Sequence, residues 1–464
     1  MGDRFTPPHP AMLPPLLALA RTVRHGDGDL LSLLPAAAYR MKSGTLGYSR
    51  RSIVLFNDPA MVREIMLDKG EAFPKSDLMV GALEPLIGDS IFVSDGEKWR
   101  PQRAMIDPAF SYMRLTVAYE AMTAAVDDYQ AHLEAAADSG KPISLDLAMG
   151  QLTADIICRT VFSVSLASHM ARDVFDDFLI FERGVAQVKV WRLITDKAWA
   201  KIDQDPAVLA ACTRIRHHLG QLIDHHQQTS SANTKQDGAN GDIAAAVMAA
   251  RDPENGAAFT REELIDQLGV FFLAGHETTA SVLTWVFYIL SIRPDILRRV
   301  RAEVSDVVGT GPITFDDTKK MIFIRAVFRE TLRLYPPITF MPRIALRDVE
   351  IGGRKLRKGA LVMIAPWTLH RHADHWTDPH VFDADRFMPA REGDIPAGAY
   401  MPFGFGPHTC VGAGFALVEA ILIIAQLARA YDFTVHAPEN VRPAARLTTR
   451  PADQIMVTVK PAHA

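Results

Sequence analysis

One cysteine in a glycine-rich segment carries the most evident chemistry in this sequence. Cys410 lies in Phe403-Gly404-Phe405-Gly406-Pro407-His408-Thr409-Cys410-Val411-Gly412, and an apolar run from Ala413 to Tyr431 follows. A buried helix is expected over that run, and a helix start favours a thiolate through its free N–H groups and its macrodipole. Gly404, Gly406 and Gly412 let the backbone turn sharply and approach a flat, bulky group.

The other cysteines lie far away in the sequence. The chain has three cysteines, Cys158, Cys212 and Cys410, so neither a CxxC redox pair nor a four-ligand zinc site forms around Cys410. So few scattered cysteines indicate a reducing cytosol rather than a disulfide framework. A lone thiolate is one of the axial ligands that an iron porphyrin takes. The alternative is an ordinary buried cysteine in a turn.

A polar cluster interrupts the longest helical pattern of the chain. Arg261 to Ile292 has a first half that is apolar nearly all round, which predicts a central, buried helix that ends before Pro294. Within it, Ala274-Gly275-His276-Glu277-Thr278-Thr279 places an acid beside an alcohol. Thr278 can donate a hydrogen bond back to the Ala274 carbonyl, and Gly275 lets a ligand approach the backbone. Such a notch can relay protons; the alternative is a threonine that only packs the helix.

Two further pairs have helical spacing. Trp99 and Arg103, at i and i+4, present an indole N–H and a guanidinium that together suit a carboxylate, although a surface cation–π pair is the alternative. Glu330 and Arg333, at i and i+3, lie in an apolar context. A buried pair of this kind needs further partners for the guanidinium.

The pattern Phe403-x-x-Gly406-x-x-x-Cys410-x-Gly412 resembles the haem-binding loop of the cytochrome P450 haem-thiolate oxygenases. The Trp-x-x-x-Arg pair, the central-helix notch and the Glu-x-x-Arg pair precede this loop in the order and spacing typical of that family. The resemblance, which covers nearly the whole chain, implies haem b with Cys410 as the axial iron ligand. It also implies Glu277 and Thr278 as the catalytic acid–alcohol pair, with O2 as co-substrate.

The resemblance extends to the residues around the haem. It implies that Trp99, Arg103, Arg343 and His408 contact the propionates and that Ala274, Phe403 and Gly412 border the haem. The segment Phe382–Phe387 resembles the one that supplies a second arginine, so we expect a structural triad of Glu330, Arg333 and Arg386. The expected substrate wall is mostly apolar and comprises Leu78, Met79, Val80, Leu83, Val188, Val190, Phe271, Ala274, Ile338, Phe340 and Thr448.

Composition indicates one large globular domain. The chain has 464 residues, of which 48% are hydrophobic and 22% charged, with a formal net charge of −4, and this balance gives no support to nucleic-acid binding. The apolar stretch at 11–23 is shorter than the ~20 residues that span a bilayer. We therefore expect a soluble, cytoplasmic monomer.

Strand-like segments cluster near residues 45–56, where a hairpin turns at 49–51, and again after residue 338, while the middle is helical. This predicts an α+β, mostly α-helical chain with the cytochrome P450 fold. We expect one domain over 1–464, with a β-rich lobe at 40–70 and 338–400 and a helical lobe at 96–335 and 411–431. Helices are expected at 59–68, 145–164 and 174–190, an irregular lid at 73–93 and a solvated loop at 227–241.

The implied reaction is monooxygenation of a hydrophobic small molecule, by hydroxylation or epoxidation. The chain has no dinucleotide fingerprint or flavin module, so electrons from NAD(P)H must arrive through a ferredoxin or flavodoxin, which we expect to dock near Lys98, Arg100 and Arg325. One alternative is a peroxide-driven or O2-independent member of the same fold, against which the acid–alcohol pair argues. The other is a non-catalytic haem-binding protein.

Overall fold

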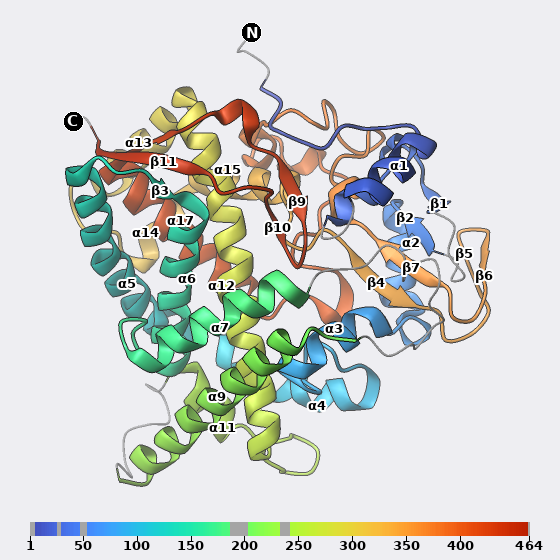
Figure 1. Cartoon of the computed structure of the whole chain (residues 1–464), viewed down its shortest axis with the longest axis horizontal. Helices are drawn as coiled ribbons and strands as arrows, with labels where there is room; N and C mark the ends of the chain where they lie inside the picture. Colours follow the sequence, from blue (N-terminus) through green and yellow to red (C-terminus); the bar gives the residue numbers. More distant parts are fainter. Residues whose placement is uncertain (1–4, 26–28, 47–52, 186–202, 233–241, 463–464) are drawn as a thin grey trace.

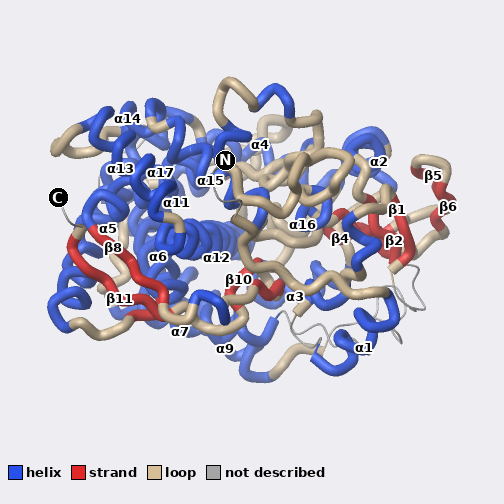
Figure 2. The backbone as a smooth tube through the Cα atoms, turned by 90° about the horizontal axis from the view of Figure 1, so that it is seen from above, coloured by secondary structure: helices blue, strands red, loops and turns tan. Residues whose placement is uncertain are grey.

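The computed structural model describes residues 5–25, 29–46, 53–185, 203–232 and 242–462. Helices make up most of the molecule, and β1, β2, β4, β5 and β6 gather at one end of it (Figures 1 and 2). The helices are α1 (Pro15–His25), α2 (Pro59–Arg63), α3 (Asp77–Ile87), α4 (Gly96–Ile106), α5 (Tyr112–Ser139), α6 (Leu145–Phe162), α7 (His169–Val185), α9 (Pro206–Ala232), α11 (Ile243–Ala249), α12 (Arg261–Ile292), α13 (Pro294–Val308), α14 (Phe315–Lys320), α15 (Ile322–Leu334), α16 (Pro366–Leu369) and α17 (Ala413–Ala430).

The strands form small sheets that join segments distant in the sequence. The largest has the order β1-β2-β7-β4, with β2 and β7 parallel and the other pairs antiparallel. A second sheet has the order β3-β11-β8, and β5–β6 and β9–β10 are two-stranded. The strands are β1 (Ser43–Thr45), β2 (Ile53–Phe56), β3 (Ile143–Ser144), β4 (Met341–Ile344), β5 (Val349–Ile351), β6 (Arg354–Leu356), β7 (Leu361–Ile364), β8 (Tyr431–Val435), β9 (Pro443–Ala445), β10 (Thr449–Pro451) and β11 (Met456–Pro461).

Helix α12 is central, as its sequence predicts. A capping box between Thr260 and Glu263 begins it, and most of its residues after the first turn are buried. Arg293 ends the helix and Pro294 starts α13, which turns away by 108°. Helices α6, α9, α15 and α17 pack around α12, so the polar cluster in its middle lies deep in the protein.

Several segments differ from the expectation. The stretch 73–93 is not irregular throughout, because Ser76 caps helix α3 and its hydroxyl accepts a hydrogen bond from the Met79 N–H. Helix α7 starts five residues before the expected 174, and residues 186–190 lie outside the described part of the chain. Strand β4 begins at Met341, so Ile338 and Phe340 precede it. Strands β1 and β2 pair antiparallel, but their turn lies outside the described residues.

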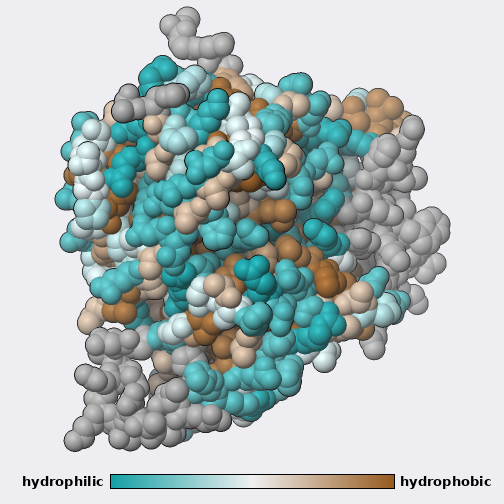
Figure 3. All heavy atoms as spheres, turned by 60° about the vertical axis from the view of Figure 1, so that its left-hand side comes forward, coloured by the Kyte–Doolittle hydropathy of each residue, from teal (hydrophilic) through white to brown (hydrophobic). Residues whose placement is uncertain are grey.

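The helix that follows the cysteine segment is a core element. By length and composition α17 is the one described helix that could cross a membrane unaided, yet 61% of that span is buried inside the protein. It packs against α5, α12, α13 and α15. On the face that Figure 3 shows, hydrophilic side chains predominate and apolar ones lie in small groups. The apolar character of α17 is therefore explained by its place in the core.

Candidate active site

A buried cavity separates the cysteine segment from the notch in α12. Its volume is about 300 Å³, and its wall includes Cys410 on one side and Ala274, Glu277 and Thr278 on the other. The cavity wall also contains each residue expected beside the haem, namely Trp99, Arg103, Ala274, Arg343, Phe403, His408, Cys410 and Gly412. The tertiary structure thus brings together residues that lie more than 300 positions apart in the sequence.

The glycines of the cysteine segment hold its backbone in a tight turn. Gly404 and Gly406 have φ of 83° and 73°, in the left-handed region that favours glycine. A Cβ on Gly406 would meet the Met66 carbonyl oxygen at 2.9 Å. The N–H of Cys410 donates to the Phe403 carbonyl at 2.8 Å, which closes the turn. Gly412, the residue before α17, has an ordinary φ of −86°, so its backbone does not require glycine.

Cys410 is open to the cavity, whereas Cys158 and Cys212 are buried in the core. Burial in an apolar setting raises the pKa of the Cys410 thiol, against the opposing effects of the Gly412 N–H and the Arg103 charge. Burial therefore opposes the thiolate that the helix start is expected to favour. A metal cation bound at the sulfur would stabilise the thiolate directly.

Buried cations gather beside the cysteine segment. The ring centroids of Trp99 and His408 lie 4.2 Å apart, and Arg103 donates to the Thr409 carbonyl at 2.6 Å. Arg343 is 7% exposed, and within the described chain no carboxylate lies within 4.0 Å of it. Burial, together with the charges of Lys75, Arg343 and Arg103, lowers the pKa of His408 to about 3.

Lys75 also belongs to this cluster, although no sequence motif pointed to it. It is 7% exposed, lines the cavity and donates from Nζ to the carbonyls of Ser94 (2.6 Å) and Ile91 (3.2 Å). Burial lowers its pKa to about 8. An isolated bridge between Lys75 and Arg343 aligns their backbones. The sequence places Lys75 in a segment without a recognisable pattern, so only the fold reveals its position.

A porphyrin fits this arrangement. The cluster holds Lys75, Arg103 and Arg343 around Asp95, which lies 3.3 Å from His408, and Asp107, which pairs with Arg103. A surplus of buried positive charge is costly unless anions compensate it. Two propionates would supply that charge, while Cys410 would be the axial ligand and the apolar wall would enclose the macrocycle. The fold and the cavity thus define the site of a haem-thiolate protein.

In the α12 notch, Thr278 donates to the Ala274 carbonyl at 2.7 Å, as the sequence predicts. Glu277 is 1% exposed, and its Oε1 accepts from the Thr448 hydroxyl at 2.5 Å and from Nε of Arg450 at 2.7 Å. Gly275 lines the cavity, where a ligand can approach its backbone as expected, and it also has a packing role. A Cβ there would meet Cδ1 of Ile157 at 2.4 Å, so this glycine allows α6 to pack closely on α12.

The expected substrate wall is partly present in the cavity. Met79, Leu83, Phe271, Ala274, Ile338, Phe340 and Thr448 line it. Leu78 and Val80 do not, because α3 is a helix and directs Met79 and Leu83, at i and i+4, to the cavity face instead. Val188 and Val190 lie outside the described residues. Apolar residues absent from the expected set also line the cavity: Ile91, Phe92, Phe110, Ile157, Val161, Ile243, Val270, Val282 and Leu447.

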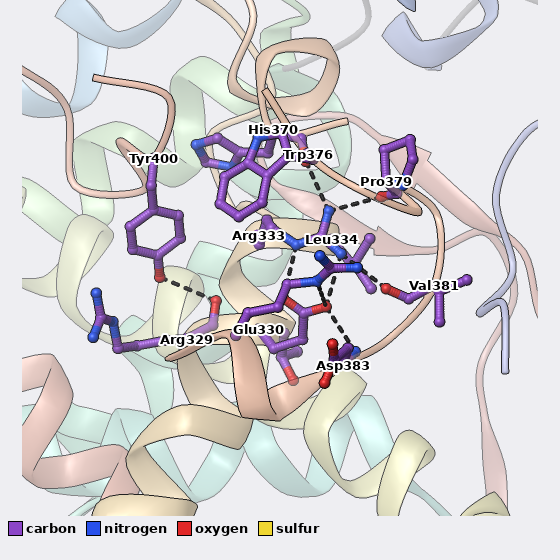
Figure 4. Close-up of polar contacts among 12 residues, drawn as sticks. Arg329, Glu330, Arg333, Leu334, His370, Trp376, Pro379, Val381, Asp383 and Tyr400 are labelled. Atoms are coloured by element: carbon purple, nitrogen blue, oxygen red, sulfur yellow. Dashed lines mark hydrogen bonds and ion pairs between the residues drawn. The ribbon is translucent and has the colours of Figure 1, made fainter. Parts of the chain in front are cut away.

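The expected triad of Glu330, Arg333 and Arg386 is assembled, and none of its members lines the cavity. Figure 4 shows Glu330 and Arg333 with their polar contacts. Glu330 and Arg333 are fully buried and pair through two bonds of 2.7 Å. Arg333 also donates to the carbonyls of His370, Pro379 and Val381. Nε of Arg386 lies 3.5 Å from Glu330. The guanidinium of Arg333 is thus fully hydrogen-bonded, as a buried ion pair requires.

Comparison with known proteins agrees with this geometry. The family model for cytochrome P450 matches residues 41–459. The crystal structure of the haem domain of cytochrome P450DA superimposes with a TM-score of 0.81 at 23% identity, and covers 99% of this chain and 98% of that one. The chain therefore belongs to the cytochrome P450 family, and it is a haem-thiolate monooxygenase of class EC 1.14.

Similar curated proteins come from bacteria, plants and mammals. Cyclooctat-9-en-7-ol 5-monooxygenase of Streptomyces melanosporofaciens is 30% identical over 89% of this chain and 84% of its own length. Cyclooctatin synthase of the same organism is 29% identical over 96% and 90%. Pentalenene oxygenase of Streptomyces avermitilis is 27% identical over 94% and 90%.

Proposed function

We propose that this protein binds haem b through Cys410 and inserts one oxygen atom from O2 into an apolar cyclic terpenoid, by hydroxylation or epoxidation. The observation that carries the proposal is the buried cavity, which opposes the cysteine segment to the acid–alcohol pair of α12 and lines the space between with apolar side chains. The haem, when bound, supplies the reductive activation of O2.

The chain's own residues divide the remaining tasks. Trp99, Arg103, Arg343 and His408, joined by Lys75, would hold the propionates. The hydroxyl of Thr278 lies at the cavity wall and Glu277 lies next to it in the sequence, so the two residues can pass protons to the reacting centre. The Glu330–Arg333–Arg386 triad would brace the fold behind the haem without taking part in the chemistry.

Two observations support a terpenoid as substrate. The cavity wall is mainly aliphatic and aromatic, and its Glu277 and Thr448 are hydrogen-bonded to each other. In addition, the names of two similar proteins refer to the oxygenation of cyclooctat-9-en-7-ol and of pentalenene. A rigid hydrocarbon skeleton suits such a wall because it needs no hydrogen-bond partners.

Electrons would come from a separate ferredoxin or flavodoxin. Arg100 is exposed on α4, and Lys98 on the same helix pairs with Asp89 at the surface. Arg325 on α15 donates to the carbonyls of Thr318 and Lys319. Basic side chains of this kind at the surface would steer an acidic partner. Charge reversal at Lys98 and Arg100 should slow reduction by a ferredoxin severalfold at low ionic strength, with little effect in high salt, as measured by stopped-flow spectroscopy.

We also propose a cytoplasmic, monomeric protein. The support for the cytoplasmic location is that the chain has only three scattered cysteines, which are unpaired among the described residues. Size-exclusion chromatography with light scattering would test the monomer.

The function is tested in two stages. First, carbon monoxide added to the reduced protein should give the thiolate-type Soret band; Cys410→Ser should abolish this band, whereas Cys158→Ser, in the core, should keep it. Second, pentalenene and related hydrocarbons should shift the haem spin state and yield oxygenated products with a ferredoxin–reductase pair. Product formation with peroxide alone, but not with the reductase pair, would favour the peroxide-driven alternative. A thiolate band without any product would leave a haem-binding protein.

A further inference from the structure

Glu277, the acid beside Thr278, is bound to a guanidinium from the C-terminal part of the chain. Nε of Arg450, on β10, donates to Oε1 of Glu277 at 2.7 Å, and its Nη2 contacts Oε2. Thr448, from the same segment, donates to the same Oε1. Among the described residues, Arg450 is the one cation within 4.0 Å of Glu277.

A second carboxylate competes for this guanidinium. Oε1 of Glu182, on α7, lies 2.8 Å from the same Nε of Arg450. Glu182 is 8% exposed and Glu277 is 1% exposed. The two carboxylates therefore lie within two hydrogen-bond lengths of each other, and among the described residues Arg450 is the one cation within 4.0 Å of either.

The surrounding charges do not restore a one-to-one balance at Glu277. Arg183 and Arg446 act on Glu182 with positive charge, while Asp146 acts on it with negative charge. His276 packs against Phe178 of α7, and complete burial lowers its pKa to about 3, so it is neutral near pH 7. Burial is also the main reason why the pKa of Glu182 is raised above its ordinary value of 4.5.

Two buried carboxylates that share one directly bound cation favour the uptake of one proton, because when both are ionised they repel each other and have a single guanidinium in contact with them. We propose that Glu182, Arg450 and Glu277 form a proton-sharing triad, in which Glu182 and Arg450 are positioning residues that allow Glu277 to act as an acid. This inference rests on the proposed role of Glu277 in proton delivery.

The triad works by exchange of the guanidinium between its two partners. When Glu277 takes up a proton from water, Arg450 pairs with Glu182, and when Glu277 has released that proton toward Thr278 and the cavity, Arg450 pairs with Glu277 again. Without the charge of Glu182, Arg450 would remain paired with Glu277 and would hold it as a carboxylate. Glu182 therefore controls how readily Glu277 is protonated again.

The pH dependence of stability tests this sharing without turnover or a known substrate. A carboxyl whose pKa is raised in the folded state stabilises the fold at low pH, and this contribution is lost as pH rises from about 4.5 through the folded-state pKa. The apparent Tm of the haem-loaded wild type should therefore decline with rising pH by about 1–3 °C from this group. Glu182→Gln should remove this decline, and Glu277→Gln should remove it too, because either change leaves one carboxylate for one guanidinium.

Asp177→Asn is the matched control. Asp177 lies on the same helix, α7, and pairs one-to-one with Arg214, so this variant should keep the decline. Glu182→Gln/Glu277→Gln should show no further loss of pH dependence beyond either single change. Arg450→Lys keeps the positive charge and should retain part of the decline. This conservative variant is used because a larger change at Arg450 could prevent folding.

A wild-type decline that persists in Glu182→Gln or in Glu277→Gln would overturn the triad. The same holds if the wild type shows no decline in this range. Each sample is first checked for the thiolate-type carbon monoxide band. Absence of that band in the wild type would instead refute the proposed function, so the two failures are distinguishable.

Discussion

Thr278 has two possible roles, one in the chemistry of the cavity and one in the stability of α12. Its hydroxyl donates to the Ala274 carbonyl, and it lines the cavity beside Glu277. The same back-bond occurs at Thr284, two turns further along and away from the cavity, where the hydroxyl donates to Ala280 at 2.8 Å. A comparison of variants at these two threonines therefore distinguishes a role in proton delivery from a role in helix packing.

Thr278→Ala should lower product formed per NADPH consumed by about 10- to 100-fold and increase released peroxide, because one step of proton transfer is lost. Thr284→Ala should change this ratio little. Coupled assays of product, NADPH and peroxide measure the effect. Equal losses in both variants would assign Thr278 a packing role.

Lys75 offers a residue-scale test of the propionate cluster. Burial lowers its pKa from 10.5 to about 8, so without haem the folded state releases this proton at a lower pH than the unfolded chain does. Stability of the haem-free protein should therefore rise as pH increases from about 8 toward 10.5, since the unfolded chain binds the extra proton there. Lys75→Met should remove this rise.

Haem-loaded protein should behave differently at this residue. A propionate beside Lys75 would keep the ammonium charged, so the alkaline rise in stability should be absent with haem bound. Thermal unfolding followed by circular dichroism from pH 7 to 10.5, with and without haem, measures both states. An identical alkaline rise in the two states would place Lys75 out of reach of the propionates.

At the scale of elements, the packing of α6 against α12 positions the acid–alcohol pair. Gly275 is the point of closest approach, and the Thr153 hydroxyl of α6 donates to the His276 carbonyl at 3.0 Å. The Glu277 carboxylate is in turn connected to α7 and β10 through Arg450. The position of the acid–alcohol pair therefore depends on α6, α7 and α12 and on the β9–β10 hairpin, which together hold the notch opposite the cysteine segment.

Gly275→Ala should destabilise the protein by about 1–3 kcal/mol, because its Cβ would overlap Cδ1 of Ile157. Gly150→Ala, in α6, is the matched control. Its Cβ would meet nothing within 4 Å, so the helix should gain roughly 0.5–1 kcal/mol. Adding Ile157→Val, which removes Cδ1, should recover part of the loss in Gly275→Ala. Chemical denaturation measures all four proteins, and a neutral Gly275→Ala would contradict the close approach.

At the scale of the whole molecule, buried ion pairs tie distant segments into one body. Arg333 of α15 binds carbonyls of residues 370, 379 and 381, and Glu330 accepts from the N–H of Asp383 at 2.8 Å. His370 in turn accepts from the N–H of Met401 at 2.9 Å. This chain of contacts leads from α15 to the start of the cysteine segment.

Glu330→Gln should cost about 3–5 kcal/mol and weaken haem retention, because it leaves Arg333 charged and fully buried without its counter-ion. Glu392→Gln breaks a surface pair with Arg329, on the same helix, and should cost less than about 1 kcal/mol. Denaturation curves and haem loss to a scavenger protein measure the two effects. Similar costs for the two variants would argue against a bracing role.

The sequence by itself determined much of this protein. The apolar pattern from Arg261 to Ile292 and the proline at 294 predicted the extent of α12, and the polar cluster within it identified the notch. The glycines at 404 and 406 could be interpreted because only glycine adopts their backbone conformation without strain. Family resemblance then assigned the cysteine ligand and the buried Glu330–Arg333 pair, since both depend on short, local spacing.

Only the tertiary structure decided which separate segments meet. It showed that Lys75 joins the cations near Cys410, that Gly275 serves the contact with Ile157, and that Leu78 and Val80 point away from the cavity. It also revealed Arg450 between Glu182 and Glu277. Glu182 and Arg450, for example, are 268 positions apart in the sequence, and no local spacing encodes such contacts. They arise because the packing of helices in the folded chain determines which charged side chains are buried next to each other.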